Sequence, residues 1–134
     1  MSVHELILRR PRLDDEQVVR SAETELAADH FGFLFWPELS WPDQLARFAC
    51  EETGSDLLDQ RVRSSFFIAV VHDQVVGRAS IRHELNDHLL NQGGHIGYAV
   101  RPQFRRRGYA TAILQAALNY LGSLQVSRAL VTCD

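Results

Sequence analysis

Cysteine is scarce in this sequence: Cys50 and Cys133 are the only two among its 134 residues. Two cysteines so far apart provide neither a disulfide framework nor the paired spacing of a zinc site. The six histidines are scattered along the chain and add no metal-ligand motif. We therefore expect no bound metal, and we expect the protein to work in a reducing compartment, the cytoplasm.

Long hydrophobic runs are also missing. No apolar stretch approaches the ~20 residues that a membrane-spanning helix needs. Residues 1–5 lack the basic region followed by an apolar one with which a signal peptide begins. The sequence thus predicts neither a membrane span nor a signal peptide.

Neither sign of charge dominates. The sequence has 14 basic and 17 acidic residues, and its formal net charge is −3. This balance argues against broad, non-specific binding of nucleic acids, so a cluster of arginines must act locally. Hydrophobic residues make up 46% of the chain and charged ones 23%, which is typical of a globular protein. We expect one domain over residues 1–134 with its own core.

The chain is organised around residues 93–122. Alternation predicts a strand with two different faces, which Pro102 ends because proline has no N–H to donate. One face carries Ile96, Tyr98 and Val100, and the other carries His95, Gly97 and Ala99.

A helix is predicted to follow, beginning near Arg107 or Gly108 and capped at its end by Gly122. Its apolar residues are spaced for one helical face, namely Ile113, Leu114, Ala117, Leu118 and Leu121.

The start of this helix favours an anion. Three consecutive arginines, Arg105–Arg107, precede Gly108, and the first backbone N–H groups of a helix have no intrahelical partners. Those donors and the positive end of the helix dipole attract a phosphate, and a side chain at Gly108 would keep it off the backbone. The alternative interpretation is an ordinary solvated helix start.

Residues 3–53 predict a strand followed by two helices. The strand spans Val3 to Arg9, and Asp14 with Gln17 forms a capping box before the first helix. The apolar face of that helix consists of Val18, Val19, Ala22 and Leu26. The second helix begins at Ser40, Pro42 and Asp43, ends at Gly54, and buries Leu45, Phe48 and Ala49.

An aromatic segment lies between these helices. Its five rings are those of Phe31, Phe33, Phe35, Trp36 and Trp41. They form either one wall of a substrate pocket or part of the core, and the core is the interpretation we favour for most of them.

The middle of the chain predicts a hairpin. The segment 66–71 is too apolar for a strand with one wet face, so it should be central in a sheet. Residues 72–74 turn the chain into a second strand over 75–82, with Val75, Gly77, Ala79 and Ile81 on one face. Residues 55–61 and 84–92 are polar and read as connections, and residues 128–133 predict a last strand.

The motif Arg105-x-x-Gly108-x-Ala110 after Val100-Arg101-Pro102 resembles the acyl-CoA-binding signature of the GNAT superfamily of N-acetyltransferases. The predicted order β-α-α-β-β-β-α-β also resembles the beginning of that α+β fold, a three-layer arrangement around a mixed sheet. Residues 82–86 and 95–98 are similar to those of a bacterial branch of the superfamily.

The resemblance implies acetyl-CoA as the co-substrate and a primary amine of a small molecule or a protein as the acceptor. It places the pyrophosphate on backbone N–H groups of the helix start and the pantetheine beside the preceding strand. The implied cofactor-binding residues are Tyr98, Ala99, Val100, Arg105, Arg106, Arg107, Gly108, Tyr109, Ala110 and Thr111.

Two residues are candidates for the general base. His95 occupies a strand position where many members have glutamate, and its ordinary pKa of about 6.5 suits a base at neutral pH. Glu84 follows the preceding predicted strand and can act directly or through water. Each also has a structural interpretation: His95 as a satisfied core residue and Glu84 as a solvated loop carboxylate.

The sequence departs from the family in one respect. Members usually continue with a further helix and two strands, which include a tyrosine that protonates the departing thiolate. We therefore expect a C-terminally short domain, and an uncovered edge at its last strand makes a homodimer physically attractive. The alternative functions are a domain that binds CoA without catalysis, and a nucleic-acid contact protein, against which the acidic net charge argues.

Overall fold

The computed structural model of the chain describes residues 5–29, 32–34, 36–54, 62–84 and 95–124. Its strands are β1 (Ile7–Arg9), β2 (Ser64–Val71), β3 (Gln74–Arg82) and β4 (Ile96–Val100). Its helices are α1 (Glu16–Ala27), α2 (Trp41–Thr53) and α4 (Tyr109–Ser123), and short 3-10 turns cover Leu13–Asp15 and Pro102–Phe104. The predicted α+β class and the order of elements as far as α4 are confirmed. The predicted last strand (128–133) and the connection 55–61 lie outside the described residues, as does most of 84–92.

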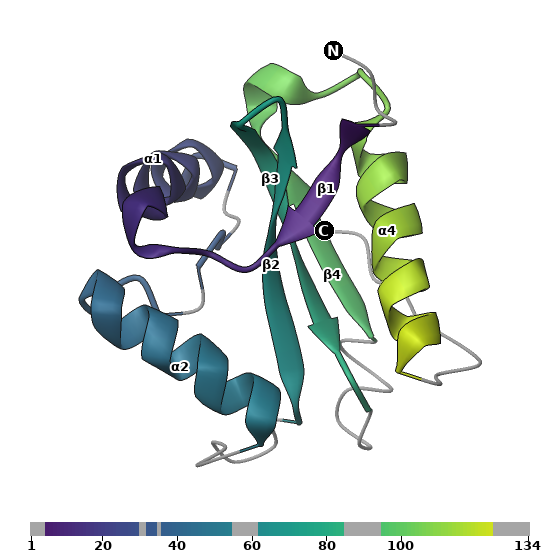
Figure 1. Ribbon diagram of the computed structural model, residues 1–134. Coiled ribbons are helices and arrows are strands. Elements are labelled where there is room, and N and C mark those ends of the chain that lie inside the picture. Colours follow the sequence, from purple (N-terminus) through teal and green to yellow (C-terminus); the bar gives the residue numbers. More distant parts are fainter. Residues whose placement is uncertain (1–4, 30–31, 35, 55–61, 85–94, 125–134) are drawn as a thin grey trace.

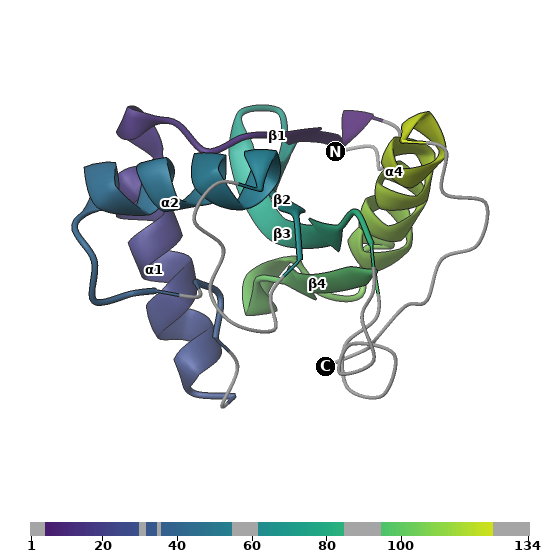
Figure 2. The same ribbon diagram turned by 90° about the horizontal axis from the view of Figure 1, so that it is seen from below.

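Four strands form one antiparallel sheet in the order β1-β2-β3-β4. Figure 1 shows α1 and α2 on one face of the sheet and α4 on the other, and Figure 2 shows the same three layers from below. All of β2 is buried, as expected for an interior strand with helices on both faces.

Aromatic rings fill the layer between the sheet and the first two helices. Phe48 of α2 stacks on Phe66 of β2, with ring centroids 4.4 Å apart, and Phe33 meets Phe66 edge-on at 6.5 Å. Phe33 and Trp41 are almost completely buried, and Trp36 packs against Phe48. The core interpretation is therefore confirmed for these rings, while Phe31 and Phe35 lie outside the described residues.

The opposite layer holds the apolar face of α4. Its buried residues are Tyr109, Ile113, Ala117 and Leu121. They pack with Ile96 and Val100 of β4, which confirms the predicted faces of that strand. Leu118 belongs to the same predicted face but lies on its edge, and it is 38% exposed.

A bulge changes the faces of β3. Ala69 pairs with Gly77 but Val70 pairs with Val75, so Val76 is an extra residue. Val75 therefore faces α1 and α2, whereas Val76 joins Ala79 in the layer under α4. The predicted common face of Val75 and Gly77 was wrong for this reason.

The β2–β3 hairpin turns at His72 and Asp73, whose φ angles are both positive, 48° and 63°. Two successive left-handed residues are typical of a tight type I′ turn, whose twist matches that of the flanking strands. Strand β3 consequently begins at Gln74, one residue earlier than predicted.

Two of the predicted helix boundaries and the extent of the first predicted strand differ from the structure. Asp14 does not cap α1: the Asp15 carboxylate accepts the Arg12 backbone N–H at 2.6 Å and closes the 3-10 turn. Gly122 is not a cap either, because α4 continues to Ser123. Residues 7–9 are the only part of the predicted strand 3–9 that the described residues form as a strand.

Helix α2 begins and ends as predicted. The Ser40 hydroxyl accepts the Asp43 backbone N–H at 3.3 Å, and Gly54 ends the helix with a φ of 84°. Within the helix Phe48 is buried and Leu45 is half-buried, but Ala49 is exposed, contrary to the prediction, because Gln44 and Glu51 occupy the inward positions beside Phe48.

Candidate functional site

A turn of unusual backbone conformation links β4 to α4. After the 3-10 turn at Pro102–Phe104, Arg106 has a φ of 65° and Gly108 a φ of 81°. Arg105, before them, is extended with a φ of −70°, and α4 begins directly after Gly108. Left-handed residues that alternate with ordinary ones turn successive N–H groups toward a common point, which makes an anion-binding concavity.

The N–H groups of this turn are available for an anion. The first hydrogen bond of α4 runs from the Ala112 N–H to the Gly108 carbonyl at 3.1 Å. Within the described part of the chain, no acceptor is found for the N–H groups of residues 106–111. The Arg105 N–H differs, since it donates to the Pro102 carbonyl at 3.3 Å. The turn and the first turn of α4 therefore present donors at the positive end of a fifteen-residue helix.

Aromatic packing fixes the turn from below. The Phe104 ring lies beneath the guanidinium groups of Arg101 and Arg107, at 5.6 and 5.8 Å from the ring centroid. The Tyr109 ring, next to Phe104, is 2% exposed and belongs to the core. Tyr109 can thus offer the site its backbone N–H but not its side chain, whereas the side chains of Arg105 and Arg106 are exposed.

Two carboxylates pair with arginines at the turn, one in α1 and one just beyond the end of that helix. Glu25 accepts two hydrogen bonds from Arg101, each 2.8 Å long, and a third from Gln103 at 3.1 Å. One helical turn later, Asp29 pairs with Arg105 at 3.1 Å. The hydrogen bonds from Arg101 hold the pKa of Glu25 below its ordinary value, although burial opposes this. Sequence reasoning missed both acids, because nothing local marks residues so distant in the chain as partners.

The outer edge of β4 presents alternate backbone groups. The Arg82 N–H bonds to the His95 carbonyl at 2.6 Å, and the Arg101 N–H bonds to the Val76 carbonyl at 2.8 Å. In an antiparallel ladder every second residue bonds to the neighbouring strand. Since His95 and Arg101 bond to β3, the N–H and carbonyl of Ala99 also point toward β3, and those of Tyr98 and Val100 point away from it. Of the three predicted pantetheine contacts, Tyr98 and Val100 therefore direct their backbone groups to the edge opposite β3.

His95 precedes β4 at the end of the strand farther from the turn. Its side chain is buried, and alternation places it on the face of Gly97 and Ala99, toward α1 and α2. Burial, and secondarily the charge of Arg82, lowers the pKa of His95 below 6.5. At neutral pH the imidazole is therefore uncharged and able to accept a proton.

Glu84 lies at the same end of the sheet, two residues beyond Arg82. Its carboxylate pairs with Arg63 at 3.1 Å, and both side chains are half exposed. The structure thus groups the predicted cofactor residues around the far half of β4 and its turn, and it places both candidate bases near the beginning of β4.

Sequence reasoning also missed a polar chain beside Glu84. The Ser65 hydroxyl lies 2.8 Å from His83 Nε2 and 2.8 Å from the Tyr120 hydroxyl. Ser65 is completely buried, and burial lowers the pKa of His83, with a smaller contribution from Arg63. These hydrogen bonds connect Tyr120, near the end of α4, to Ser65 in β2.

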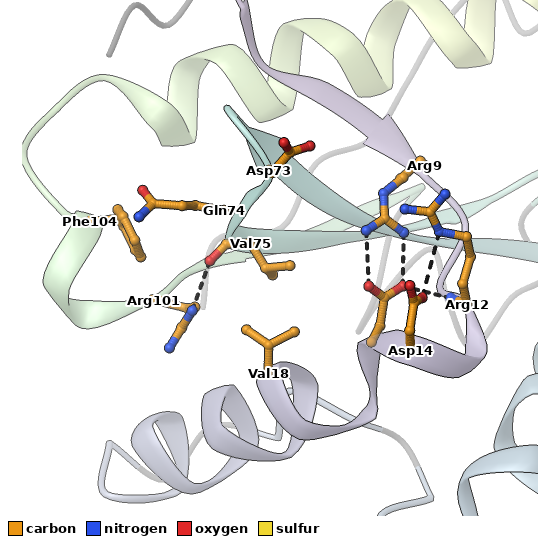
Figure 3. A pocket seen from close by; sticks show the side chains of 10 residues that line it. Arg9, Arg12, Asp14, Val18, Asp73, Gln74, Val75, Arg101 and Phe104 are labelled. Carbon is orange, nitrogen blue, oxygen red and sulfur yellow. Dashed lines mark hydrogen bonds and ion pairs between the residues drawn. The ribbon is translucent and has the colours of Figure 1, made fainter.

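A pocket of about 410 Å³ adjoins the turn on the side of α1 (Figure 3). Val18 and Val75 face one another across it, and Arg101 and Phe104 form the wall nearest the turn. Its charged groups neutralise one another, because Arg9 donates two hydrogen bonds to Asp15, 2.8 and 2.9 Å long. Burial would raise the pKa of Asp15, but these bonds and the one from the Arg12 N–H hold it below its ordinary value.

In the part of the chain that the structure describes, no helix is long and apolar enough to cross a membrane. Across the same residues, no three histidine, cysteine, aspartate or glutamate side chains gather closely enough to hold a metal ion.

Comparison with models of protein families gives a match over almost the whole chain. The family model described as the acetyltransferase (GNAT) domain matches residues 5–134. No curated protein matches the chain.

Proposed function

The chain belongs to the GNAT family of acetyltransferases, and we propose that it transfers an acetyl group from acetyl-CoA directly to a primary amine of a small molecule or a protein. The observation that carries the proposal is the turn before α4. Its alternating backbone conformation and its donors without acceptors among the described residues suit a pyrophosphate.

In this proposal the residues of the turn contact the cofactor through different groups. Backbone N–H groups of Arg106 through Thr111 face the phosphates, and the Thr111 hydroxyl adds a further donor. Arg105 contributes its guanidinium rather than its N–H, which the Pro102 carbonyl already accepts. Gly108 lets the phosphates approach the backbone, because its left-handed conformation and missing side chain leave that side open.

The edge of β4 orients the rest of the cofactor. In this proposal the pantetheine lies beside Tyr98, Ala99 and Val100 and pairs with the outward backbone groups of Val100. An N–H of this segment polarises the thioester carbonyl as the amine attacks, since a fixed donor stabilises the developing negative charge.

The attacking amine must lose a proton. We propose His95 as the general base, with Glu84 as the second candidate. His95 is neutral at pH 7 and lies on the face of β4 toward the first two helices. Glu84 would have to act from its ion pair with Arg63, directly or through water.

The acceptor is a separate molecule. All 14 basic residues are arginine, so the chain has no lysine side chain to acetylate. Acetylation of a lysine residue in an assay is therefore acetylation of another protein. We further propose a single domain that works in the cytoplasm, pairs as a homodimer, and acts without nucleic acid or a membrane.

Two measurements test the proposal. Acetyl-CoA at 100 times its dissociation constant should stabilise the fold by about 2.7 kcal/mol, whereas acetate or adenosine should not. Release of the CoA thiol in the presence of a panel of amines then tests turnover. No stabilisation at saturating acetyl-CoA would refute the cofactor, and stabilisation without thiol release would indicate a domain that binds CoA without catalysis.

A further inference from the structure

The first arginine of the phosphate-binding turn already has an anionic partner. Arg105 Nη2 lies 3.1 Å from Asp29 Oδ2, and the two side chains are 47% and 51% exposed. Asp29 lies two residues beyond Ala27, the last residue of α1, and donates its own N–H to the Leu26 carbonyl. An aspartate anchored on the end of α1 therefore reaches across to the turn.

The neighbouring ion pair, Arg101 with Glu25, is more buried and has more hydrogen bonds. Arg101 and Glu25 are 11% and 28% exposed, they share two hydrogen bonds, and Arg101 also donates to the Val75 carbonyl at 2.9 Å. By contrast, a single hydrogen bond joins Arg105 to Asp29, and both side chains are about half exposed. Exposed pairs of this kind contribute little to stability and exchange their partners easily.

From this contrast we propose that Asp29 is an internal competitor for the cofactor, an inference that rests on the proposed function. In the free protein the Asp29 carboxylate occupies the guanidinium of Arg105 that a CoA phosphate takes in the complex. The pyrophosphate as a whole carries two negative charges and several acceptor oxygens, whereas the carboxylate carries one charge, so the pyrophosphate displaces the carboxylate. The turn itself stays in place meanwhile, because Arg101 and Glu25 hold it.

This arrangement has a cost for affinity. Each binding event must break the Asp29–Arg105 pair, and the displaced carboxylate then lies near a ligand of its own sign. Removing the charge of Asp29 should therefore tighten CoA binding, and the gain should depend on Arg105 being present.

A double-mutant cycle on the dissociation constant of CoA tests this dependence. By calorimetric titration at constant pH and ionic strength, we expect Asp29→Asn to bind CoA about two- to fivefold more tightly than the parent protein, the range that exposed ion pairs give. Arg105→Ala should bind more weakly, and Asp29→Asn in the Arg105→Ala background should give a clearly smaller gain, because only the repulsion between the carboxylate and the ligand is then left to remove. Glu38→Gln, which removes an exposed carboxylate outside the turn and α1, should leave the affinity unchanged.

Each outcome decides the matter. Equal tightening by Asp29→Asn with and without Arg105 would overturn the proposal in favour of plain charge repulsion. No tightening in either background would overturn it as well, and Asp29→Ser would give the same answer if the asparagine variant did not fold. If the parent protein bound no CoA at all, the proposed function would fail and this inference with it. CoA binding with unchanged affinity in Asp29→Asn would refute the inference alone.

Discussion

Arg101 and Glu25 lie side by side, with Nε–Oε1 and Nη2–Oε2 distances of 2.8 Å each. The same guanidinium donates to the Val75 carbonyl, so one side chain joins α1, the beginning of β3 and the end of β4. The turn that we propose to bind phosphate begins at the next residue, Pro102. Its position relative to α1 and the sheet therefore depends on this pair.

Arg101→Gln should lower the free energy of unfolding by about 1.5–3 kcal/mol, the value of hydrogen bonds to charged groups. Urea unfolding measures the loss. Glu25→Gln should give a comparable loss, and the double variant should lose clearly less than the sum, because the two side chains share one interaction. Strictly additive losses would mean that the two residues stabilise the protein independently.

Gly108→Val should abolish CoA binding. A β-branched residue at a φ of 81° is strained, and its side chain would occupy the space that the phosphates need. Calorimetric titration of the folded variant measures the binding. Gly122→Ala is a suitable control, because a Cβ there meets no atom within 4 Å and the residue is helical. That control should bind CoA normally and gain up to about 1 kcal/mol of stability. Parental affinity in Gly108→Val would place the phosphates elsewhere.

Gly77→Ala and Gly97→Ala form a matched pair on neighbouring strands. A Cβ at Gly77 would lie 2.2 Å from the Ala99 carbonyl oxygen, so β3 and β4 would have to move apart. A Cβ at Gly97 would meet its nearest neighbour, Arg78 Nη1, at an ordinary 3.7 Å. We expect chemical unfolding to show a loss of about 1–3 kcal/mol for Gly77→Ala and a much smaller change for Gly97→Ala. Equal losses would contradict the close approach at Gly77.

His95→Ala should lower the acetylation rate at neutral pH by about 10²–10⁴-fold, the usual contribution of a positioned base. The dissociation constant of CoA should barely change, since we propose that the turn and the outer edge of β4 hold the cofactor. The rate should also lose the acidic limb of its pH profile, which reports protonation of His95. If Glu84→Gln gives the large loss instead and His95→Ala is mild, then Glu84 is the base.

Stability should fall as the pH drops below the ordinary histidine pKa of about 6.5. Burial lowers the pKa of both His83 and His95, so the unfolded chain binds protons before the folded protein does. Their contribution is complete above about pH 6.5 and is lost as the pH falls through the folded pKa values. Urea unfolding at a series of pH values should show a shallower decline for His83→Gln than for the parent protein. Identical declines would mean that the pKa of His83 is the same in both states.

Much of this fold follows from local patterns. The apolar periodicities at Val19 and Ile113 predicted α1 and α4, and Ser40 and Gly54 marked the ends of α2, because each signal acts within a few residues. The bulge at Val76 could not be predicted, since it satisfies the pairing of β3 with β2 and leaves no mark on the apolar pattern.

The sequence likewise predicted one part of the candidate site and not the other. Arg105 and Gly108 mark the turn in the sequence, and its backbone conformation agrees with the pattern. Glu25 lies in α1 and Asp29 just beyond its end, among charges that look like an ordinary solvated face, and only the packing of α1 against the sheet brings them to the turn. Sequence distance hides these pairs, and it hides the Ser65–Tyr120 hydrogen bond for the same reason.

The order of strands in the sheet has a consequence for folding kinetics. Strand β2 pairs with β3 through a two-residue turn, whereas β1, the first strand of the chain, pairs Ile7 with Val70 across both α1 and α2. Closing that long loop costs more entropy than closing the hairpin, and contacts of high sequence separation slow folding. The hairpin and its partner β4 can therefore assemble as an early nucleus, and the docking of β1 completes the sheet late. Arg9 ends β1 and Arg10 follows it, so their ion pairs with Asp15 and Glu52 form only when β1 docks. Interactions that form after the transition state change the unfolding rate more than the folding rate.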